Sequence, residues 1–264
     1  MKYDVNIMKY EYKYMVPNEL LSELRTRISP FVEKDRYMDM GSINGYTVRS
    51  IYFDTPNLDF YHDKIAGLKI RKKFRIRGYN DYNHENVVFL EIKRKNQKKI
   101  YKHRAAVKFL DLHDLLATGD VEKYILLDHG LKSALDSSRR FLFHIHTSIL
   151  QPNVLVIYER EAFFGKFDRS LRITFDKNLR SSMHPELLGL FKEVNIKHFL
   201  YNHFILEVKF YHEFPSWMKP IIASLGLKLN AFSKYTKSID KHMVVHNNSR
   251  LLPHNFTCKK LTMN

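Results

Sequence analysis

The stretch from which the fold can be read is LKIRKKFRIR, residues 68–77. In a β-strand, successive side chains point to opposite faces of the sheet. The even positions are then apolar apart from Lys72, whereas every odd position is a lysine or an arginine. At roughly 3.3 Å per residue, the odd positions form a cationic row about 27 Å long. Because like charges on one strand face repel each other, the row predicts carboxylates or an anionic partner beside it.

The same alternation recurs along the chain, so that at least seven stretches combine one charged and one apolar face. In an open, half-buried sheet the charged faces would simply meet water. Their repetition, with both signs of charge, instead favours an α+β fold: a closed antiparallel eight-stranded tunnel barrel with a charged lumen and helices packed outside. The charged faces are Lys9, Glu11 and Lys13; Glu91, Lys93 and Lys95; Lys102 and Arg104; Arg172, Thr174 and Asp176; and Glu207 and Lys209.

Hydrophobic periodicity and turn residues predict the remaining elements. We expect one domain over residues 1–242, because no Gly- or Pro-rich linker and no repeat interrupts it, followed by a basic, poorly ordered tail over residues 243–264. Strands are predicted at 6–15, 46–54, 68–79, 87–95, 100–109, 154–160, 170–176 and 204–210. Helices are predicted at 18–31, 121–135, 139–150, 215–225 and 230–242.

Composition limits the class of protein. The chain has 264 residues with 44 Lys and Arg against 28 Asp and Glu, a formal charge of +16, and one cysteine. A single cysteine excludes an intramolecular disulfide framework and a cysteine-based zinc site. No stretch approaches the roughly 18 apolar residues of a membrane span, and the N-terminus lacks a signal-peptide core, so we expect a soluble, cytoplasmic protein. The charge predicts an anionic partner.

Eight short motifs occur in an order that resembles the VTC (vacuolar transporter chaperone) domain. This domain belongs to the triphosphate tunnel metalloenzymes, whose fold is shared with the CYTH-type triphosphatases. The resemblance runs from about residue 8 to 240, and each motif alone is weakly specific. The motifs are Glu11–Val16, Arg49–Asp54, Arg75–Tyr79, Leu90–Lys95 with Lys102, Tyr158–Phe163, Arg172–Asp176, Ile205–Lys209 and Phe232–Tyr235.

The resemblance implies a polyphosphate polymerase, which adds the γ-phosphoryl group of ATP to a growing polyphosphate chain inside a basic tunnel. It implies Mn²⁺ or Mg²⁺ as cofactor, and ATP and polyphosphate as partners. We expect no nucleic-acid partner, and a membrane-protein partner stays open. By motif, the catalytic residues would be Arg75, Arg77, Arg172 and Lys93. Phosphate would be bound by Lys13, Arg49, Lys102, Ser233, Lys234 and Lys209, and the metal by Glu207, Glu91 and Glu11.

Two positions depart from the family pattern. Lys9 replaces the first glutamate of the Glu-x-Glu-x-Lys start that is typical of the triphosphatases, and Ala231 stands where the polymerases carry a basic residue. One carboxylate fewer weakens metal activation of water and favours transfer over hydrolysis. Three alternatives to the polymerase stay open: a triphosphatase of the same fold, a non-catalytic polyphosphate-binding module, and a nucleic-acid-binding protein.

Overall fold

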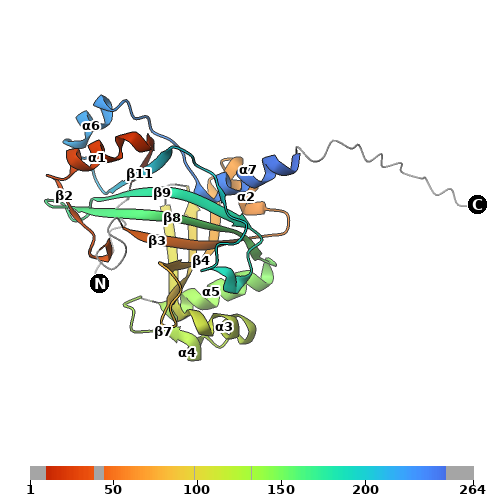
Figure 1. The fold of residues 1–264 in the computed structure, drawn as a ribbon. Helices are drawn as coiled ribbons and strands as arrows, with labels where there is room; N and C mark the ends of the chain where they lie inside the picture. The colour runs from red at the N-terminus through yellow and green to blue at the C-terminus, as the bar shows by residue number, and fades with distance from the viewer. Residues whose placement is uncertain (1–9, 39–44, 98, 132, 248–264) are drawn as a thin grey trace, which may run out of the picture.

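The strands form one large antiparallel sheet. The computed structural model describes residues 10–38, 45–97, 99–131 and 133–247 (Figure 1). Over these residues the sheet has eleven strands in the order β1–β11–β9–β8–β3–β4–β5–β6–β7, with β2 beside β8 and β10 beside β9. The strands are β1 Tyr10–Pro17, β2 Val32–Lys34, β3 Tyr46–Asp54, β4 Ile70–Tyr79, β5 Val87–Asn96, β6 Lys99–Lys108, β7 Ile125–Leu126, β8 Gln151–Gly165, β9 Arg172–Met183, β10 Lys197–His198 and β11 His203–Phe210.

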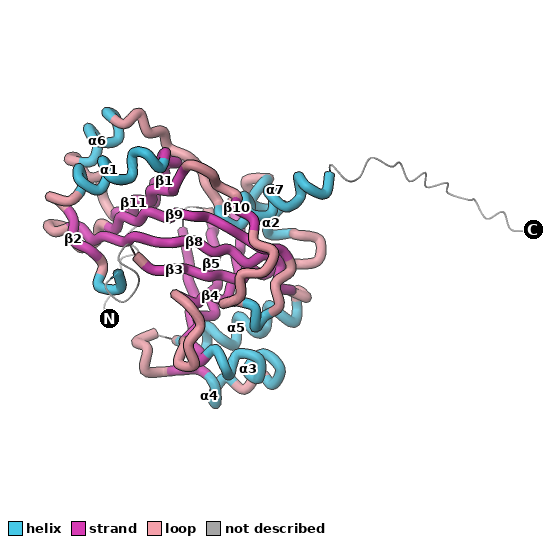
Figure 2. Tube along the Cα trace, viewed as in Figure 1, coloured by secondary structure: helices cyan, strands magenta, loops and turns pink. Residues whose placement is uncertain are grey.

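The helices lie around the edges and outer face of the sheet, as the tube view shows (Figure 2). In Figure 1, α3, α4 and α5 lie below the sheet, α1 and α6 lie above its β2 end, and α2 and α7 lie together at the opposite end. The helices are α1 Leu21–Ile28, α2 Asp59–Ile65, α3 Leu112–Thr118, α4 Val121–Tyr124, α5 Ala134–Thr147, α6 Met218–Ser224 and α7 Lys234–Asn247. Short 3₁₀ turns occupy Asn18–Leu20, Arg36–Met38, Phe109–Asp111 and Leu187–Gly189.

The predicted faces of β4 are confirmed. Phe74 and Ile76, at even positions, are fully buried. The ring of Phe74 contacts Phe141 of α5, with 6.1 Å between the ring centroids. The opposite face carries Arg75 and Arg77, whose side chains bond to polar groups on the neighbouring strands β5 and β3. Burial of the apolar face under α5 therefore fixes the direction in which the cationic row points.

The prediction of a closed eight-stranded barrel is wrong. The sheet has additional short strands, and within the described residues β1 and β6 do not pair with each other. The outer edge of β1 instead contacts the segment before α7: Tyr14 bridges to Leu229, and the Asn230 amide donates to the Lys13 carbonyl at 2.8 Å. On the outer edge of β6, Ala106 and Val107 pair with β7. The facing edges of β1 and β6 thus contact other segments, and the barrel is left open between them.

Several predicted elements also differ in extent. Residues 46–54 form β3 as predicted, but a helix over 121–135 is wrong, because only α4 forms before the chain turns into β7. The strand predicted at 154–160 is the much longer β8. The predicted tail begins within α7, and its remainder from 248 lies outside the described residues. No helix in the described part is long and apolar enough to span a bilayer.

Candidate functional site

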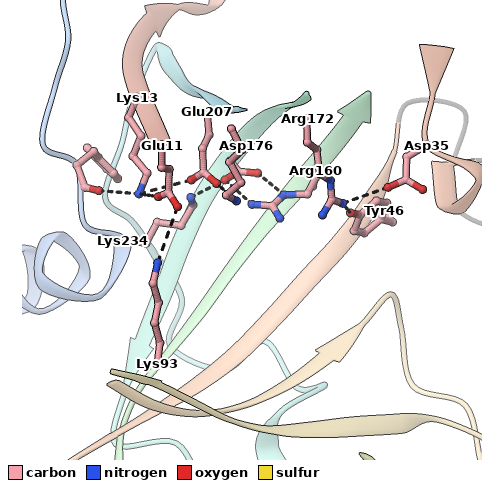
Figure 3. Close-up of polar contacts among 12 residues, drawn as sticks. Glu11, Lys13, Asp35, Tyr46, Lys93, Arg160, Arg172, Asp176, Glu207 and Lys234 are labelled. Atoms are coloured by element: carbon pink, nitrogen blue, oxygen red, sulfur yellow. Dashed lines mark hydrogen bonds and ion pairs between the residues drawn. The ribbon is translucent and has the colours of Figure 1, made fainter. Parts of the chain in front are cut away.

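The inner face of the curled sheet gathers most of the predicted site residues. Lys93 on β5 and Glu11 on β1 are separated by five strands in the sheet order. Nevertheless, the Lys93 ammonium lies 3.8 Å from a Glu11 carboxylate oxygen (Figure 3). The sheet therefore curves until its two ends face each other. Side chains of alternate positions on β1, β4, β5, β9 and β11 point into the same concave space, which we call the inner face.

Three arginines surround Glu91 on the inner face. Arg75 Nε donates to the Glu91 carboxylate at 2.5 Å, Arg104 Nε lies 3.2 Å from its other oxygen, and Arg77 lies 3.9 Å away. Burial raises the pKa of Glu91, but the three positive charges outweigh it and lower the pKa to about 2. Arg77 also donates to Ser50 Oγ at 3.0 Å. Glu91 thus holds a guanidinium cluster in place.

A second cluster joins β1 and β11. The Lys13 ammonium lies 2.8 Å from Glu11 and 3.5 Å from Glu207, and Lys209 forms an ion pair with Glu207. Burial and the neighbouring Glu207 raise the pKa of Glu11, yet Lys13, Lys209 and Lys93 lower it to about 2. The pKa of Glu207 is likewise well below its ordinary value, because Lys209 and Lys13 outweigh its burial. Both carboxylates are therefore ionised at neutral pH.

A third cluster contains Arg160, which the sequence did not identify as a site residue. Its guanidinium donates to both oxygens of the fully buried Asp176, at 2.6 and 2.9 Å, and Lys234 lies 2.5 Å from the same carboxylate. The pairing register between β8 and β9 shifts between Ile157 and Glu159. This irregularity obscures the phase of the strand, so alternation alone could not assign Arg160 to the inner face.

Lys73 connects the inner face to the segment before α7. Its ammonium donates to Ser233 Oγ at 3.1 Å, and it lies 5.8 Å from the ring centre of Tyr235. Burial lowers the pKa of Lys73 to about 7; the charge of Tyr52 opposes this shift, and Lys13, Lys93 and Arg75 add to it. Sequence analysis did not assign Lys73 to the site. Its role follows from the contact with Ser233, which lies 160 positions away.

Tyr52 lies beside the same arginines. Its hydroxyl accepts from Arg75 at 3.1 Å, and its ring stacks on Tyr235 with 5.2 Å between the centroids. Burial raises the pKa of Tyr52, but Arg75, Arg77 and Lys73 outweigh it and lower the pKa to about 7. The inner face is thus sufficiently positive to ionise a buried phenol near neutral pH.

Not every predicted residue joins these clusters. Arg49 points to the other face of β3, where it donates to Asp81 at 2.9 Å and lies 2.9 Å from Glu193. The reason is its odd position: Ser50 and Tyr52 occupy the inner-face phase of this strand. Lys102 lies directly opposite Lys93 and therefore shares its face, but it is exposed.

Arg172 lies at the far side of the inner face, where it donates to Asp35 at 3.1 Å and to Tyr46 at 3.3 Å. Its Nε atom and the Thr174 hydroxyl are buried without a hydrogen-bond partner among the described residues. Buried polar groups are rarely left in this state unless water or a ligand satisfies them. One is a cation and the other can donate, so the pair suits an anionic oxygen.

The carboxylates fit a metal ion only in part. Within the described ranges, no group of three or more His, Cys, Asp or Glu side chains is arranged to hold one. Glu11 and Glu207 share Lys13 and could supply two oxygen ligands, which suits Mg²⁺ or Mn²⁺ when phosphate oxygens complete the shell. Glu91 belongs to a separate set of ion pairs with three arginines and fits this role poorly.

A protein-family model covers most of the chain. The family model described as VTC domain matches residues 8–243. Vacuolar transporter chaperone complex subunit 4 of Trypanosoma brucei brucei is 26% identical over 206 residues, which are 64% of this chain and 25% of that protein. The chain thus spans about a quarter of the length of this relative.

Solved structures resemble the chain more distantly. PH1819 protein from Pyrococcus horikoshii OT3 is 14% identical with a TM-score of 0.43, covering 88% of this chain and 99% of its own. The putative adenylyl cyclase HpAC1 from Hippeastrum, described as having a dominant triphosphatase activity, is 15% identical with a TM-score of 0.43, covering 93% and 98%. Likeness at this level carries no information about function.

Proposed function

Because this chain belongs to the VTC domain family, we propose that its inner face is a phosphotransferase site that adds the γ-phosphoryl group of ATP to a polyphosphate chain. The observation that carries the proposal is the convergence of Arg75, Arg77 and Arg104 around one carboxylate, opposite the lysines of β1 and β11. Guanidinium groups are well suited to phosphate oxygens, which they bind through paired hydrogen bonds.

The proposed reaction needs no nucleophile from the protein. A terminal oxygen of the polyphosphate chain forms a bond to the γ-phosphorus, the bond from that phosphorus to the β-bridging oxygen breaks, and ADP leaves. Catalysis of this kind is mostly positioning and neutralisation of charge. Arg75 and Arg77 would bind the equatorial oxygens, and Arg172 with Thr174 would bind a neighbouring phosphate through the unpaired atoms. Lys234 and Ser233 would contact phosphate at the α7 end of the inner face.

Glu11 and Glu207 would hold a Mn²⁺ or Mg²⁺ ion, which supplies further charge neutralisation when it is bound. Replacing Glu207 with glutamine keeps the size of the side chain but removes one anionic ligand. We expect Mn²⁺ binding in the presence of triphosphate to weaken by about tenfold, measured by titration calorimetry.

The matched control for the metal experiment is Glu159→Gln. It removes the same charge from a carboxylate that is 42% exposed and lies near Arg180. The control variant should bind Mn²⁺ as the wild type does. Equal Mn²⁺ affinity in Glu207→Gln and the wild type would remove Glu207 from the metal site.

The low pKa of Lys73 predicts a pH-dependent affinity for phosphates. Lys73 is protonated below about pH 7, whereas above this pH it is neutral and Tyr52 becomes a phenolate. Both changes make the inner face less positive, so triphosphate affinity should fall as the pH rises through 7. The variant Lys73→Met should show a smaller ratio between its dissociation constants above and below that pH. Because titration of triphosphate itself is the same for both proteins, an unchanged ratio would contradict the assignment.

The products formed from ATP test the proposed reaction. Purified protein is incubated with ATP and Mn²⁺, and the products are separated on a polyacrylamide gel stained for polyphosphate. A ladder of long chains supports the polymerase. Orthophosphate without chains would instead indicate a triphosphatase. Polyphosphate binding without turnover would indicate a binding module, and this outcome would agree with the exposed Ala231, which stands where the polymerases carry a basic residue.

The relative from Trypanosoma is named as a subunit of a complex, and this suggests partners. We propose that the chain works on the cytoplasmic side of a membrane, with a membrane protein that receives the polymer. Nucleic acid is a weaker candidate ligand, because the cations lie on a concave strand face between carboxylates and not along an exposed helix.

A further inference from the structure

The cationic row continues past the three arginines toward the beginning of β4. On the inner face, Lys73 pairs directly with Lys93, and the next inner pair is Arg71 with Lys95. Two cations placed opposite each other destabilise a sheet unless an opposite charge lies between them. Lys93 has such compensation from Glu11, whereas Lys73 donates to the neutral Ser233 hydroxyl and has its pKa lowered to about 7 by burial. The Arg71–Lys95 pair forms no ion pair within the described part of the chain.

A third cation lies beside this pair. Lys64, in the last turn of α2, is half-buried, as are Arg71 and Lys95. The Leu68 amide, two residues before β4, donates to the Asp63 carbonyl at 3.0 Å, which holds the last turn of α2 beside the start of β4. Burial lowers the pKa of Lys64, and the charges of Arg71, Lys13 and Lys95 lower it further. Lys64 has no ion pair with a described carboxylate either. Three half-buried cations thus share one end of the inner face, and we call them the mouth cluster.

The mouth cluster lies too far from the arginines to bind the same short ligand. Arg71 precedes Arg75 by four residues on one strand, a separation of about 13 Å at roughly 3.3 Å per residue. A triphosphate group held by Arg75 and Arg77 is shorter than this separation. A longer condensed phosphate chain that follows the inner face past Lys73 and Lys93 would reach Arg71.

We propose that Lys64, Arg71 and Lys95 form a second phosphate-binding site, which holds the part of a polyphosphate chain beyond the units bound at Arg75 and Arg77. The site makes affinity depend on chain length: long chains contact both clusters, whereas triphosphate contacts only the arginines. This inference rests on the proposed function, since it assumes that the inner face binds condensed phosphates.

The register of β4 and β5 supplies a matched control. Lys72 pairs directly with Arg94, one position away from the Arg71–Lys95 pair, but on the outer face near His144. The test variant is Arg71→Gln with Lys95→Gln, and the control is Lys72→Gln with Arg94→Gln. Both remove two positive charges from the same strands. Dissociation constants for sodium triphosphate and for a long polyphosphate are measured at one fixed ionic strength, with thermal unfolding to verify that each variant folds.

Removing two charge-assisted contacts should weaken long-chain binding by at least about tenfold. Triphosphate affinity should stay within about twofold, and the control should affect both ligands little. Three outcomes would contradict the proposed second site: an equal loss of affinity for both ligands, an unchanged affinity for long chains, or the same loss of long-chain affinity in the control variant. If the wild type binds neither ligand, the proposed function itself fails, and that result differs from any of these.

Discussion

Replacing Arg75 with alanine should reduce polyphosphate synthesis by at least about 10³-fold, the size of effect seen when an arginine that stabilises a transferring phosphoryl group is removed. Arg75 is the guanidinium in closest contact with Glu91 and also donates to Tyr52. Its loss leaves Glu91 with Arg77 and Arg104, so the carboxylate keeps counter-charges and the sheet should still fold. The rate of chain formation from ATP and Mn²⁺ is the measurement.

A variant on the same hairpin separates local chemistry from overall charge. Arg94→Ala removes one exposed cation from the outer face of β5 and should leave synthesis within about twofold of the wild type. Arg75→Lys keeps the charge without the planar fork of donors, and we expect it to recover only a small part of the activity. Synthesis in Arg75→Ala within tenfold of the wild type would exclude Arg75 from the reaction.

Replacing Asp54 with alanine should lower the free energy of unfolding by about 3 kcal/mol, because it leaves several buried donors without an acceptor. The Asp54 carboxylate is fully buried and accepts from the amides of Thr55, Phe60 and Tyr61 at 2.8 to 3.0 Å, and from the Tyr235 hydroxyl. The Phe60 and Tyr61 amides belong to the first turn of α2, where backbone donors lack helical partners. Urea denaturation provides the measurement.

The partial variant Tyr235→Phe serves as the comparison. It removes one donor to Asp54 and preserves the stacking on Tyr52, so it should lower the free energy of unfolding by about 1.5 kcal/mol. Burial and the charge of Asp54 raise the pKa of Tyr235, so this hydroxyl stays protonated as a donor near neutral pH. If Asp54→Ala were no less stable than Tyr235→Phe, the capping of α2 would contribute nothing measurable.

The sequence predicted the strand faces well because the two-residue period leaves little choice. Once Phe74 and Ile76 are assigned to the core, Arg75 and Arg77 must point to the other face. The same period explains the position of Arg49. It alternates with Ser50 and Tyr52 and therefore shares the face of the buried Ile51, although the family motif suggested a phosphate contact.

Contacts between distant segments could not be predicted in this way. Arg160 was missed because a register shift interrupts the alternation of β8, and Lys73 because nothing local indicates that Ser233 reaches it. The prediction of a closed barrel failed for a related reason. Whether β1 pairs with β6 depends on which segment takes its free edge, and Leu229 has no sequence signal that marks it as that segment.

The contact of β1 with Leu229 and Asn230 also constrains the order of folding. The first described strand meets residues 229 and 230, so the more than 200 residues between them must be synthesised before this contact can form. Contacts of such long sequence separation form slowly, because loop-closure entropy is lost before they stabilise anything. Until that segment is available, Lys13 lacks the Phe232 carbonyl to which it donates at 3.3 Å. Affinity for phosphates should therefore develop only late in the folding of this domain.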